Sequence, residues 1–283
     1  GRGPHRQRPA DGRRKLADDL AVGLHAGEVV AYRQPLVELA SNRTVEVEAL
    51  ARWNHPTLDT LGPMAFLDLA EDAGLDLPLG DAVLRSACQA LQGLPQPLRL
   101  GINLSVAQLT DRGLAARIAG ILREYSLPPE RLVVEITERD TLARRAGVGR
   151  AAPERTLTEL REMGASLALD DFGTGYSSLT HIRRYTLNSV KIDRTFVAGV
   201  CTHPEDRAVV AAVVGMAGAL GLQVVAEGVD TDEQYDTLRE LGCTMAQGFL
   251  IAHPMTAAEM RDWMETRGDD WRHPVASLAR RSQ

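Results

Sequence analysis

Short apolar runs alternate along the chain with segments of helical periodicity. The runs that predict strands cover residues 29–34, 45–51, 98–104, 132–137, 166–170, 189–192, 223–226 and 244–248. The periodic segments that predict helices cover residues 15–25, 64–73, 81–91, 114–125, 156–163, 206–220, 231–241 and 256–266. Eight strands that alternate with helices predict an α/β fold, a single-domain (β/α)8 barrel of the TIM type. An open doubly wound sheet would alternate in the same way, but no G-x-G-x-x-G turn follows the first strand.

The two ends of the chain lack this alternation. Residues 1–14 are rich in Gly, Pro and Arg, which is typical of a disordered linker or a tag remnant. The barrel domain is predicted over residues 15–266, and residues 267–283 read as a polar C-terminal tail. Both ends suggest a domain cut from a longer chain. A surface loop is expected over residues 139–155.

One stretch is long enough to span a bilayer. Residues 208–226 carry no charged side chain. Gly221 divides the stretch into a helix-like part and a short strand-like part, so we predict a helix followed by a buried strand and no membrane segment. No signal peptide is visible, and Cys88, Cys201 and Cys243 form no metal-ligand or disulfide pattern. A cytoplasmic location is therefore expected, although the full-length protein could carry a membrane anchor elsewhere.

The composition of the chain limits the kinds of molecule that it can bind. The 283 residues are 44% apolar but only 4% aromatic, so Leu, Val, Ile and Ala must build the core. The net charge of −6 argues against a protein that grips extended nucleic acid. A small phosphate substrate remains possible because bound metal ions can reverse the local sign of the charge.

Polar side chains recur near the C-terminal ends of seven predicted strands. They are Glu48, Asn103, Glu135, Asp170, Lys191, Glu227 and Gln247, and Glu138, Asp171 and Asp193 directly follow a strand. In a barrel these strand ends converge on the face that carries the active site. A single strand-end carboxylate is commonly a helix cap or a turn residue, but capping does not explain the joint pattern.

The oxygen atoms of these side chains predict a site for hard metal ions. It offers carboxylate and amide oxygens and includes no Cys or His, which suits Mg²⁺ or Mn²⁺. The adjacent Asp170 and Asp171 are suited to bridging two ions, and two ions about 3.5–4 Å apart can clamp a phosphodiester and supply hydroxide.

Lysine is scarce in this chain. Of its 32 basic residues only Lys15 and Lys191 are lysines. Because Lys191 lies at a strand end, this position favours a lysine whose compact ammonium would lie beside the metals and an attacking water. The alternative is that the lysine occurs there by chance.

Eight segments carry a family resemblance. They are QPLVEL from Gln34, EALARWNHP from Glu48, INLSVAQL from Ile102, VEITE from Val134, DDFGTGYSSL from Asp170, VKIDRTFV from Val190, VVAEGVD from Val224 and QGFL from Gln247. In this order, over roughly residues 16–264, they resemble the EAL-domain cyclic di-GMP phosphodiesterases. The resemblance implies a TIM-like barrel whose first strand can run antiparallel to the others. It also implies metal-dependent hydrolysis of cyclic di-GMP to linear pGpG, which lowers the level of this bacterial second messenger.

The resemblance also implies roles by position. The ligands of one Mg²⁺ or Mn²⁺ ion would be Glu48, Asn103, Glu135 and Asp170, with Asp171 shared and Glu227 and Gln247 at a second ion. The catalytic residues would be Glu48, Asp171, Lys191, which orients the water, and Glu227, a candidate base. The substrate contacts would be Gln34, Arg52 on a phosphate, and Asp193. Glu138 would anchor the loop over residues 171–178, which shapes the metal site and the face of a homodimer. Sensor or GGDEF domains would lie outside this chain.

Two departures and two alternative functions accompany this resemblance. Asp230 stands where the family has Glu, and Arg33 stands where an aromatic residue is common.

Some family members lose catalysis and serve as cyclic di-GMP receptors, but those lack ligands that this chain retains. An enolase-type lyase would need Lys or His bases at strand ends, and the pair Asp170–Asp171 with a lone Lys191 fits phosphodiester hydrolysis better.

Overall fold

The computed structural model describes residues 8–94, 97–137, 151–173 and 185–273. Its strands are β1 (Val29–Glu38), β2 (Thr44–His55), β3 (Asp59–Leu61), β4 (Arg99–Asn103), β5 (Leu132–Thr137), β6 (Ser166–Phe172), β7 (Ser189–Ile192), β8 (Gln223–Ala226) and β9 (Met245–Ala246). Its α-helices are α1 (Arg8–Ala26), α2 (Leu67–Asp72), α3 (Asp76–Leu91), α4 (Val106–Leu109), α5 (Leu114–Glu124), α7 (Ala151–Glu162), α9 (Arg194–Gly199), α10 (Pro204–Leu220), α11 (Asp232–Leu241) and α12 (Ala257–Arg267). Two 3₁₀ helices, η1 (Pro63–Ala65) and η2 (Pro129–Arg131), complete the described elements.

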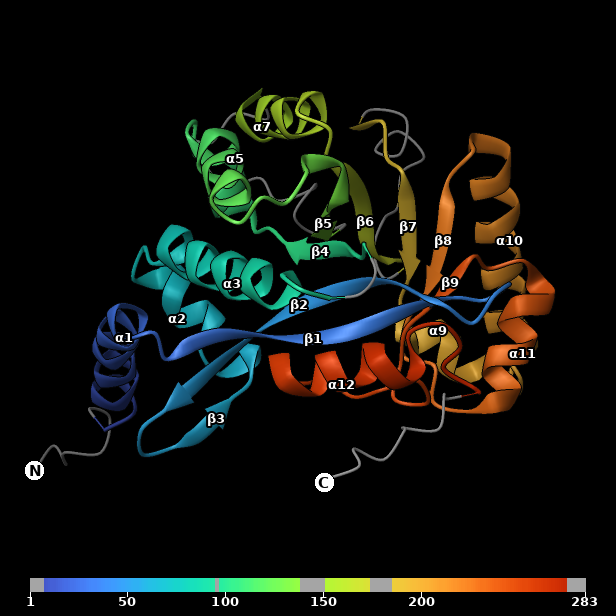
Figure 1. Ribbon diagram of the computed structural model, residues 1–283, viewed down its shortest axis with the longest axis horizontal. Helices are drawn as coiled ribbons and strands as arrows, with labels where there is room; N and C mark the ends of the chain where they lie inside the picture. Colours follow the sequence, from blue (N-terminus) through green and yellow to red (C-terminus); the bar gives the residue numbers. More distant parts are fainter. Residues whose placement is uncertain (1–7, 95–96, 138–150, 174–184, 274–283) are drawn as a thin grey trace, which may run out of the picture.

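The strands close into a barrel surrounded by helices (Figure 1). Their order is β1-β9-β8-β7-β6-β5-β4-β2, and pairing of β1 with β2 closes the ring, while β3 extends β2 as a hairpin. β1 runs antiparallel to both of its neighbours, and the other seven strands of the ring pair in parallel. The predicted barrel and its antiparallel first strand are confirmed.

The strand period of two separates the barrel interior from the helical layer. Along β2, Val47 and Ala49 join the main hydrophobic core, whereas the alternate residues Glu46 and Glu48 take part in the polar contacts described below. Because successive side chains of a strand point to opposite faces, one face of β2 carries the acidic residues. Parallel pairing then brings the C-terminal ends of seven strands to one rim of the barrel.

Several element boundaries differ from the sequence expectation, and those of α1, β1 and α7 are among them. α1 begins at Arg8 and so includes part of the segment expected to be disordered. β1 continues to Glu38, four residues beyond the predicted end. α7 begins at Ala151, inside the segment expected to be a loop. Pattern locates such elements better than it locates their ends, where neighbouring strands and helices decide how far pairing continues.

The start of the C-terminal tail packs against the barrel domain. Trp271 is 6% exposed and donates from its indole nitrogen to the Tyr235 hydroxyl at 3.3 Å. The Arg272 guanidinium lies 4.3 Å from the centre of the Tyr235 ring and pairs with Asp232 at 2.9 Å. This short aperiodic segment is held by individual side chains, which a periodicity argument does not detect.

The charge-free stretch forms a helix and a strand, as predicted. α10 ends at Leu220, Gly221 adopts the left-handed conformation with φ 70°, and β8 follows. Gly tolerates this conformation because it has no Cβ. Among the described residues, no helix combines the length and the apolarity that a bilayer crossing needs.

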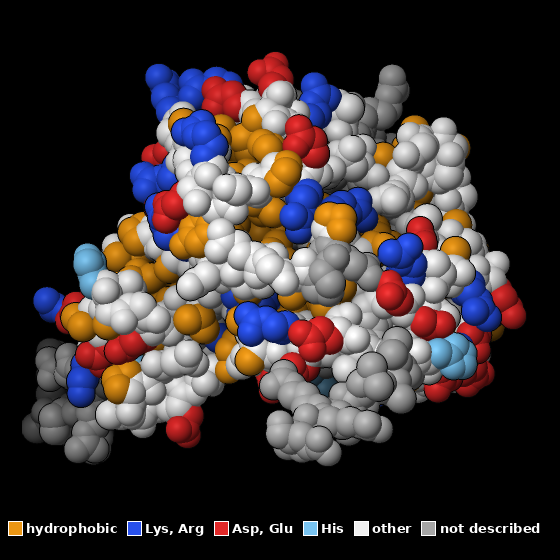
Figure 2. All heavy atoms as spheres, viewed as in Figure 1, with side chains coloured by type: hydrophobic (Ala, Val, Ile, Leu, Met, Phe, Trp, Pro, Cys, Tyr) orange, Lys and Arg blue, Asp and Glu red, His pale blue; other side chains and the backbone are white. Residues whose placement is uncertain are grey.

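The surface carries charges of both signs. Figure 2 shows Lys and Arg side chains interspersed with Asp and Glu on one face, together with scattered apolar side chains. As far as the described residues on this face show, basic groups do not form the continuous track that extended nucleic acid would require.

Candidate active site

Lys191 stands at the centre of the acidic strand ends. It is 1% exposed, and its Nζ lies 2.5 Å from Glu135, 2.7 Å from Glu227, 3.3 Å from Glu48 and 3.7 Å from Asp170. These four carboxylates come from β5, the end of β8, β2 and β6. The barrel thus gathers around one ammonium the residues that the sequence placed on separate strands.

Glu48 is held by a ring of amide donors. Its Oε1 accepts from Asn103 Nδ2 at 2.7 Å, and its Oε2 accepts from Gln247 Nε2 at 2.8 Å. The same Gln247 nitrogen lies 3.0 Å from Gln34 Oε1, and Gln34 in turn donates to the carbonyl of Ala252. Asn103 at the end of β4 and Gln247 after β9, which is itself joined to Gln34 on β1, therefore fix the Glu48 carboxylate in one orientation.

A second acidic group lies at the ends of β6 and β8. Asp170, Asp171 and Glu227 each offer an oxygen atom within 4.8 Å of the other two. The Asp171 amide donates to the Asp170 carboxylate at 2.9 Å, and Asp171 has a positive φ of 54°. Only a few per cent of residues other than Gly adopt such a φ, and functional sites are enriched in them. The irregularity within β6, where its pairing with β7 shifts register between Leu169 and Phe172, thus presents both carboxylates together.

Burial and mutual repulsion raise the pKa values of several carboxyl groups. Burial, assisted by neighbouring carboxylates such as Asp170, raises the pKa of Glu135 well above its ordinary value and that of Asp171 to about 6. Burial also raises the pKa of Glu227 to about 8, against the opposing effect of Lys191. Such shifts are typical of a site that is built to hold positive charge.

Lys191 and Glu48 shift in the opposite sense, toward their charged forms. Burial alone would lower the pKa of Lys191, but the surrounding carboxylates, Asp170 first, raise it well above its ordinary value. Burial alone would raise the pKa of Glu48, but Lys191 and the amide donors of Gln247 and Asn103 lower it. The directions of these pKa shifts therefore favour a charged Lys191 and a charged Glu48 within the cluster.

The raised pKa values predict a pH-dependent stability for the metal-free protein. Between pH 4.5 and 8, Glu227 is protonated in the folded state and ionised in the unfolded state, so the folded state binds more protons and stability falls as the pH rises. Asp171 acts in the same direction between pH 3.8 and 6. We expect the free energy of unfolding in EDTA to fall by about 4 kcal/mol between pH 5 and 8, most of it from Glu227. Denaturant titration at the two pH values measures this change.

A neutral variant supplies the control for that measurement. Glu227→Gln removes the titrating group and should show a smaller loss of stability over the same pH range. Mn²⁺ should also oppose the loss, because a divalent ion takes the place of the protons. Stability that stays constant or rises between pH 5 and 8 would contradict the assignment.

The remaining predicted residues lie around this cluster. Gln34 is buried and joined to Gln247. Arg52 lies on β2 with its guanidinium 5.4 Å from the centre of the Tyr32 ring, and it donates to the carbonyl of Ala51. Asp193 accepts from the amide of Thr195 at 2.9 Å as the N-cap of α9. That capping role was the simpler alternative for a strand-end carboxylate, and the substrate contact by Asp193 stays a prediction.

Part of the predicted site falls outside the described residues. Glu138 and residues 174–178 of the loop after β6 belong to this part. Their roles as loop anchor and as loop stay predictions.

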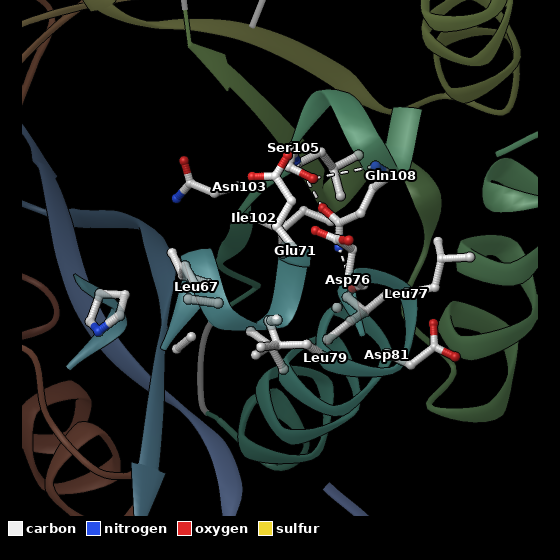
Figure 3. A pocket seen from close by; sticks show the side chains of 18 of the residues that line it. Leu67, Glu71, Asp76, Leu77, Leu79, Asp81, Ile102, Asn103, Ser105 and Gln108 are labelled. Atoms are coloured by element: carbon white, nitrogen blue, oxygen red, sulfur yellow. Dashed lines mark hydrogen bonds between the residues drawn. The ribbon is translucent and has the colours of Figure 1, made fainter. Parts of the chain in front are cut away.

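A cavity of about 410 Å³ is lined by Asn103 (Figure 3), whose side chain donates to Glu48 of the cluster. Leu50 and Asn103 line it on the side of the barrel, and α2 and α3 contribute Leu67 and Asp76. Gln108, whose side chain donates to the carbonyl of Asp76 at 2.8 Å, fixes α4 against α3. The cavity is mostly apolar with a few convergent polar groups, which is the usual character of a small-molecule site.

The residues present fit divalent metal ions. The cluster places four carboxyl groups around Lys191, and Asp171 adds a fifth beside Asp170 and Glu227. Gln247 Oε1 is buried without a hydrogen-bond partner among the described residues. All these donors are oxygen atoms, which hard divalent cations prefer.

Sequence reasoning missed a buried ion pair beneath the cluster. Glu46 is 3% exposed, and its Oε2 lies 3.2 Å from Arg99 Nε. Burial raises the pKa of Glu46, and the positive charges of Arg99 and Lys191 act against that rise. The available signal was the spacing of two between Glu46 and Glu48, which places both on one face of a strand.

Comparisons with known proteins agree with one another. The EAL domain family matches residues 17–254. The chain is 41% identical over 252 residues to cyclic di-GMP phosphodiesterase RocR of Pseudomonas aeruginosa, which is 87% of this chain and 62% of that protein. It is 36% identical to cyclic di-GMP phosphodiesterase PA2567 of the same organism, over 86% of this chain and 41% of that protein. The chain therefore spans less than two thirds of the length of these relatives.

A solved structure shares the fold. The MucR phosphodiesterase in complex with c-di-GMP superposes with a TM-score of 0.79 at 37% identity, over 87% of this chain and 99% of that chain. A cAMP- and cyclic-di-GMP-bound form of the EAL enzyme Bd1971 superposes with a TM-score of 0.82 at 26% identity, over 90% of this chain and 70% of that chain.

Proposed function

The chain belongs to the EAL domain family, and on that premise we propose that it is a metal-dependent phosphodiesterase that hydrolyses cyclic di-GMP to linear pGpG. The observation that carries the proposal is the convergence of four carboxylates on the Lys191 ammonium at the C-terminal rim of the barrel. The names of RocR and PA2567 and the ligand of the MucR complex support this substrate.

Two Mg²⁺ or Mn²⁺ ions are the proposed cofactors. Glu48, Asn103, Glu135 and Asp170 would hold one ion, Asp171 would be shared, and Glu227 and Gln247 would complete the second site. When bound, such ions neutralise phosphate charge and lower the pKa of a coordinated water. The Lys191 ammonium neutralises part of the negative charge of the carboxylates that would bind the ions.

The protein's own residues orient the reactants and move protons. Hydrolysis adds hydroxide to phosphorus, breaks one bond between phosphorus and a ribose oxygen, and delivers a proton to that oxygen. Lys191 donates hydrogen bonds and would hold the attacking water on one side of the phosphorus. Glu227, at 2.7 Å from Lys191 Nζ, is the proposed base for that water. Arg52 would pair with a phosphate oxygen, with geometry that a guanidinium can make bidentate.

The cavity beside Asn103 is proposed to take one guanine base. Guanine presents adjacent N–H donors that a carboxylate can accept, and Asp76 lines the cavity. The apolar side chains of Leu50 and Leu67 provide surfaces against which a base can pack. The cavity adjoins Asn103, so a base held there would leave its phosphate near the cluster.

Asp76→Asn tests this placement of the base. Replacing the carboxylate by an amide should raise KM for cyclic di-GMP about tenfold with little change in kcat, because the lost hydrogen bond binds substrate and transition state equally. Asp81→Asn is the matched control, since Asp81 also lines the cavity but pairs with Arg117 at 3.0 Å. Equal kinetics of the Asp76 variant and wild type would argue against a base in this cavity.

Turnover measured directly tests the function. The purified chain is incubated with cyclic di-GMP and Mg²⁺ or Mn²⁺, pGpG is followed by chromatography, and EDTA serves as control. Metal-dependent formation of pGpG is expected. Tight nucleotide binding without turnover would instead favour the receptor alternative, and absence of both would refute the functional assignment.

The wider context of the domain is also a proposal. A homodimer, a cytoplasmic location and companion sensor or GGDEF domains are expected from family resemblance. The name of one relative, a bifunctional diguanylate cyclase/cyclic di-GMP phosphodiesterase, supports the combination with a cyclase domain.

A further inference from the structure

A second charged layer lies inside the barrel below the proposed metal ligands. Glu46 precedes Glu48 by two residues on β2, and Arg99 precedes Asn103 by four residues on β4, so each pair shares the inner face of its strand. The ladder pairs Glu46 with Arg99 directly. This ion pair thus sits one layer closer to the N-terminal ends of the strands than the cluster does.

Gly101 connects the two layers. An added Cβ at Gly101 would overlap Glu135 Oε1 and would lie 3.3 Å from Glu46 Oε1. The two carboxylate oxygens therefore border the same small gap, and Glu135 Oε1 is buried without a hydrogen-bond partner among the described residues. Two acidic oxygens that face one gap repel each other. That repulsion favours the orientation in which Glu135 Oε2 points at Lys191, 2.5 Å away.

The two members of the pair differ in their access to water. The Glu46 side chain is 4% exposed and the Arg99 side chain is 28% exposed. Arg99 also donates to Gln223 Oε1 at 3.1 Å, which holds the guanidinium at the floor of the barrel. Solvent screens the charge of the Arg99 guanidinium more than the charge of the buried Glu46 carboxylate. The positive charge of Arg99 therefore cancels only part of the negative potential that Glu46 exerts on the cluster.

We propose that Glu46, fixed by Arg99, is a positioning residue that strengthens divalent-cation binding by the cluster above it and keeps Glu135 turned toward Lys191. Glu46 is one layer removed from the proposed ligands and acts through Glu135 and through its charge. The proposal rests on the proposed function only in taking the cluster as a cation site.

Glu46→Gln tests the proposal with the shape of the side chain preserved. Mn²⁺ binding to the whole chain is measured by calorimetry without nucleotide, together with thermal unfolding in EDTA. We expect the Mn²⁺ dissociation constant to rise about tenfold, because a unit charge near a divalent ion is lost. The unfolding temperature in EDTA should fall only slightly, because solvent reaches the Arg99 guanidinium that loses its partner. Glu46→Asp, which keeps the charge, should recover part of the affinity.

The outcomes separate this role from a structural one. Unchanged Mn²⁺ affinity in Glu46→Gln overturns the proposal, as does a loss of affinity that accompanies a large fall of the unfolding temperature in both variants. Failure of the wild-type chain to bind Mn²⁺ overturns it as well. Mn²⁺ binding that responds to Glu46→Gln in a chain that does not turn over cyclic di-GMP would support this inference while removing the proposed function.

Discussion

Glu48→Gln should lower turnover of cyclic di-GMP about 10³-fold or more, equivalent to about 4 kcal/mol of transition-state stabilisation. Glu48 accepts hydrogen bonds from Asn103, Gln247 and Lys191 at once. An amide in its place loses the negative charge and sets its own NH₂ group against at least one of these donors. The variant should therefore bind Mn²⁺ more weakly even though its size is unchanged.

The measurement compares pGpG formation by wild type and variant across a range of Mn²⁺ concentrations. Glu240→Gln, on the exposed side of α11, makes the same chemical change away from the site and should leave turnover unchanged. Partial recovery of the Glu48 variant at high Mn²⁺ would fit a weakened metal site. Turnover within a few fold of wild type would show that Glu48 is not a required ligand.

Lys191→Met should cost both activity and stability. Methionine has nearly the same length but no charge, so four carboxylates lose the ammonium that they share. Breaking a buried ion pair by removing one partner costs about 3–5 kcal/mol. We expect a loss of this size in EDTA at pH 8, and a smaller loss at pH 5, where raised pKa values keep Glu227 and Asp171 protonated.

Metal and a control variant complete this test. Mn²⁺ should restore part of the stability of Lys191→Met, because the ions supply the missing positive charge, but it should not restore turnover. Lys15→Met changes the other lysine, which is exposed on α1, and should alter neither quantity. A Lys191 variant as stable as wild type in EDTA at pH 8 would mean that the carboxylates do not depend on the ammonium.

The barrel was predictable because its signal is repetitive. Each strand, such as β5, β7 or β8, is a short apolar run, and the predicted bounds of these three match the structure. The convergence of the strand-end side chains was predictable in outline for a related reason. Charged side chains inside apolar strands are costly unless paired, so their presence at Glu48, Glu135 and Lys191 already required partners.

Features without periodicity escaped prediction. The docked Trp271 and the short helices α4 and α9 depend on single caps and contacts, such as the Ser105 hydroxyl that accepts from the Gln108 amide. The start of α1 at Arg8 was not predicted either, because the helical periodicity of the sequence begins only at residue 15.

The sequence by itself determined the order of the strands along the chain, the side-chain chemistry at their ends and the scarcity of lysine that drew attention to Lys191. Only the tertiary structure decided which of these groups touch. Closure of the ring through β1 and β2 brings Gln34 to Gln247 and Glu48 to Lys191, across 213 and 143 residues. Distances of this kind follow from strand pairing around a closed barrel. A linear pattern can state that a buried charge needs a partner, but the choice of the partner is made in three dimensions, as it is for Glu46 and Arg99.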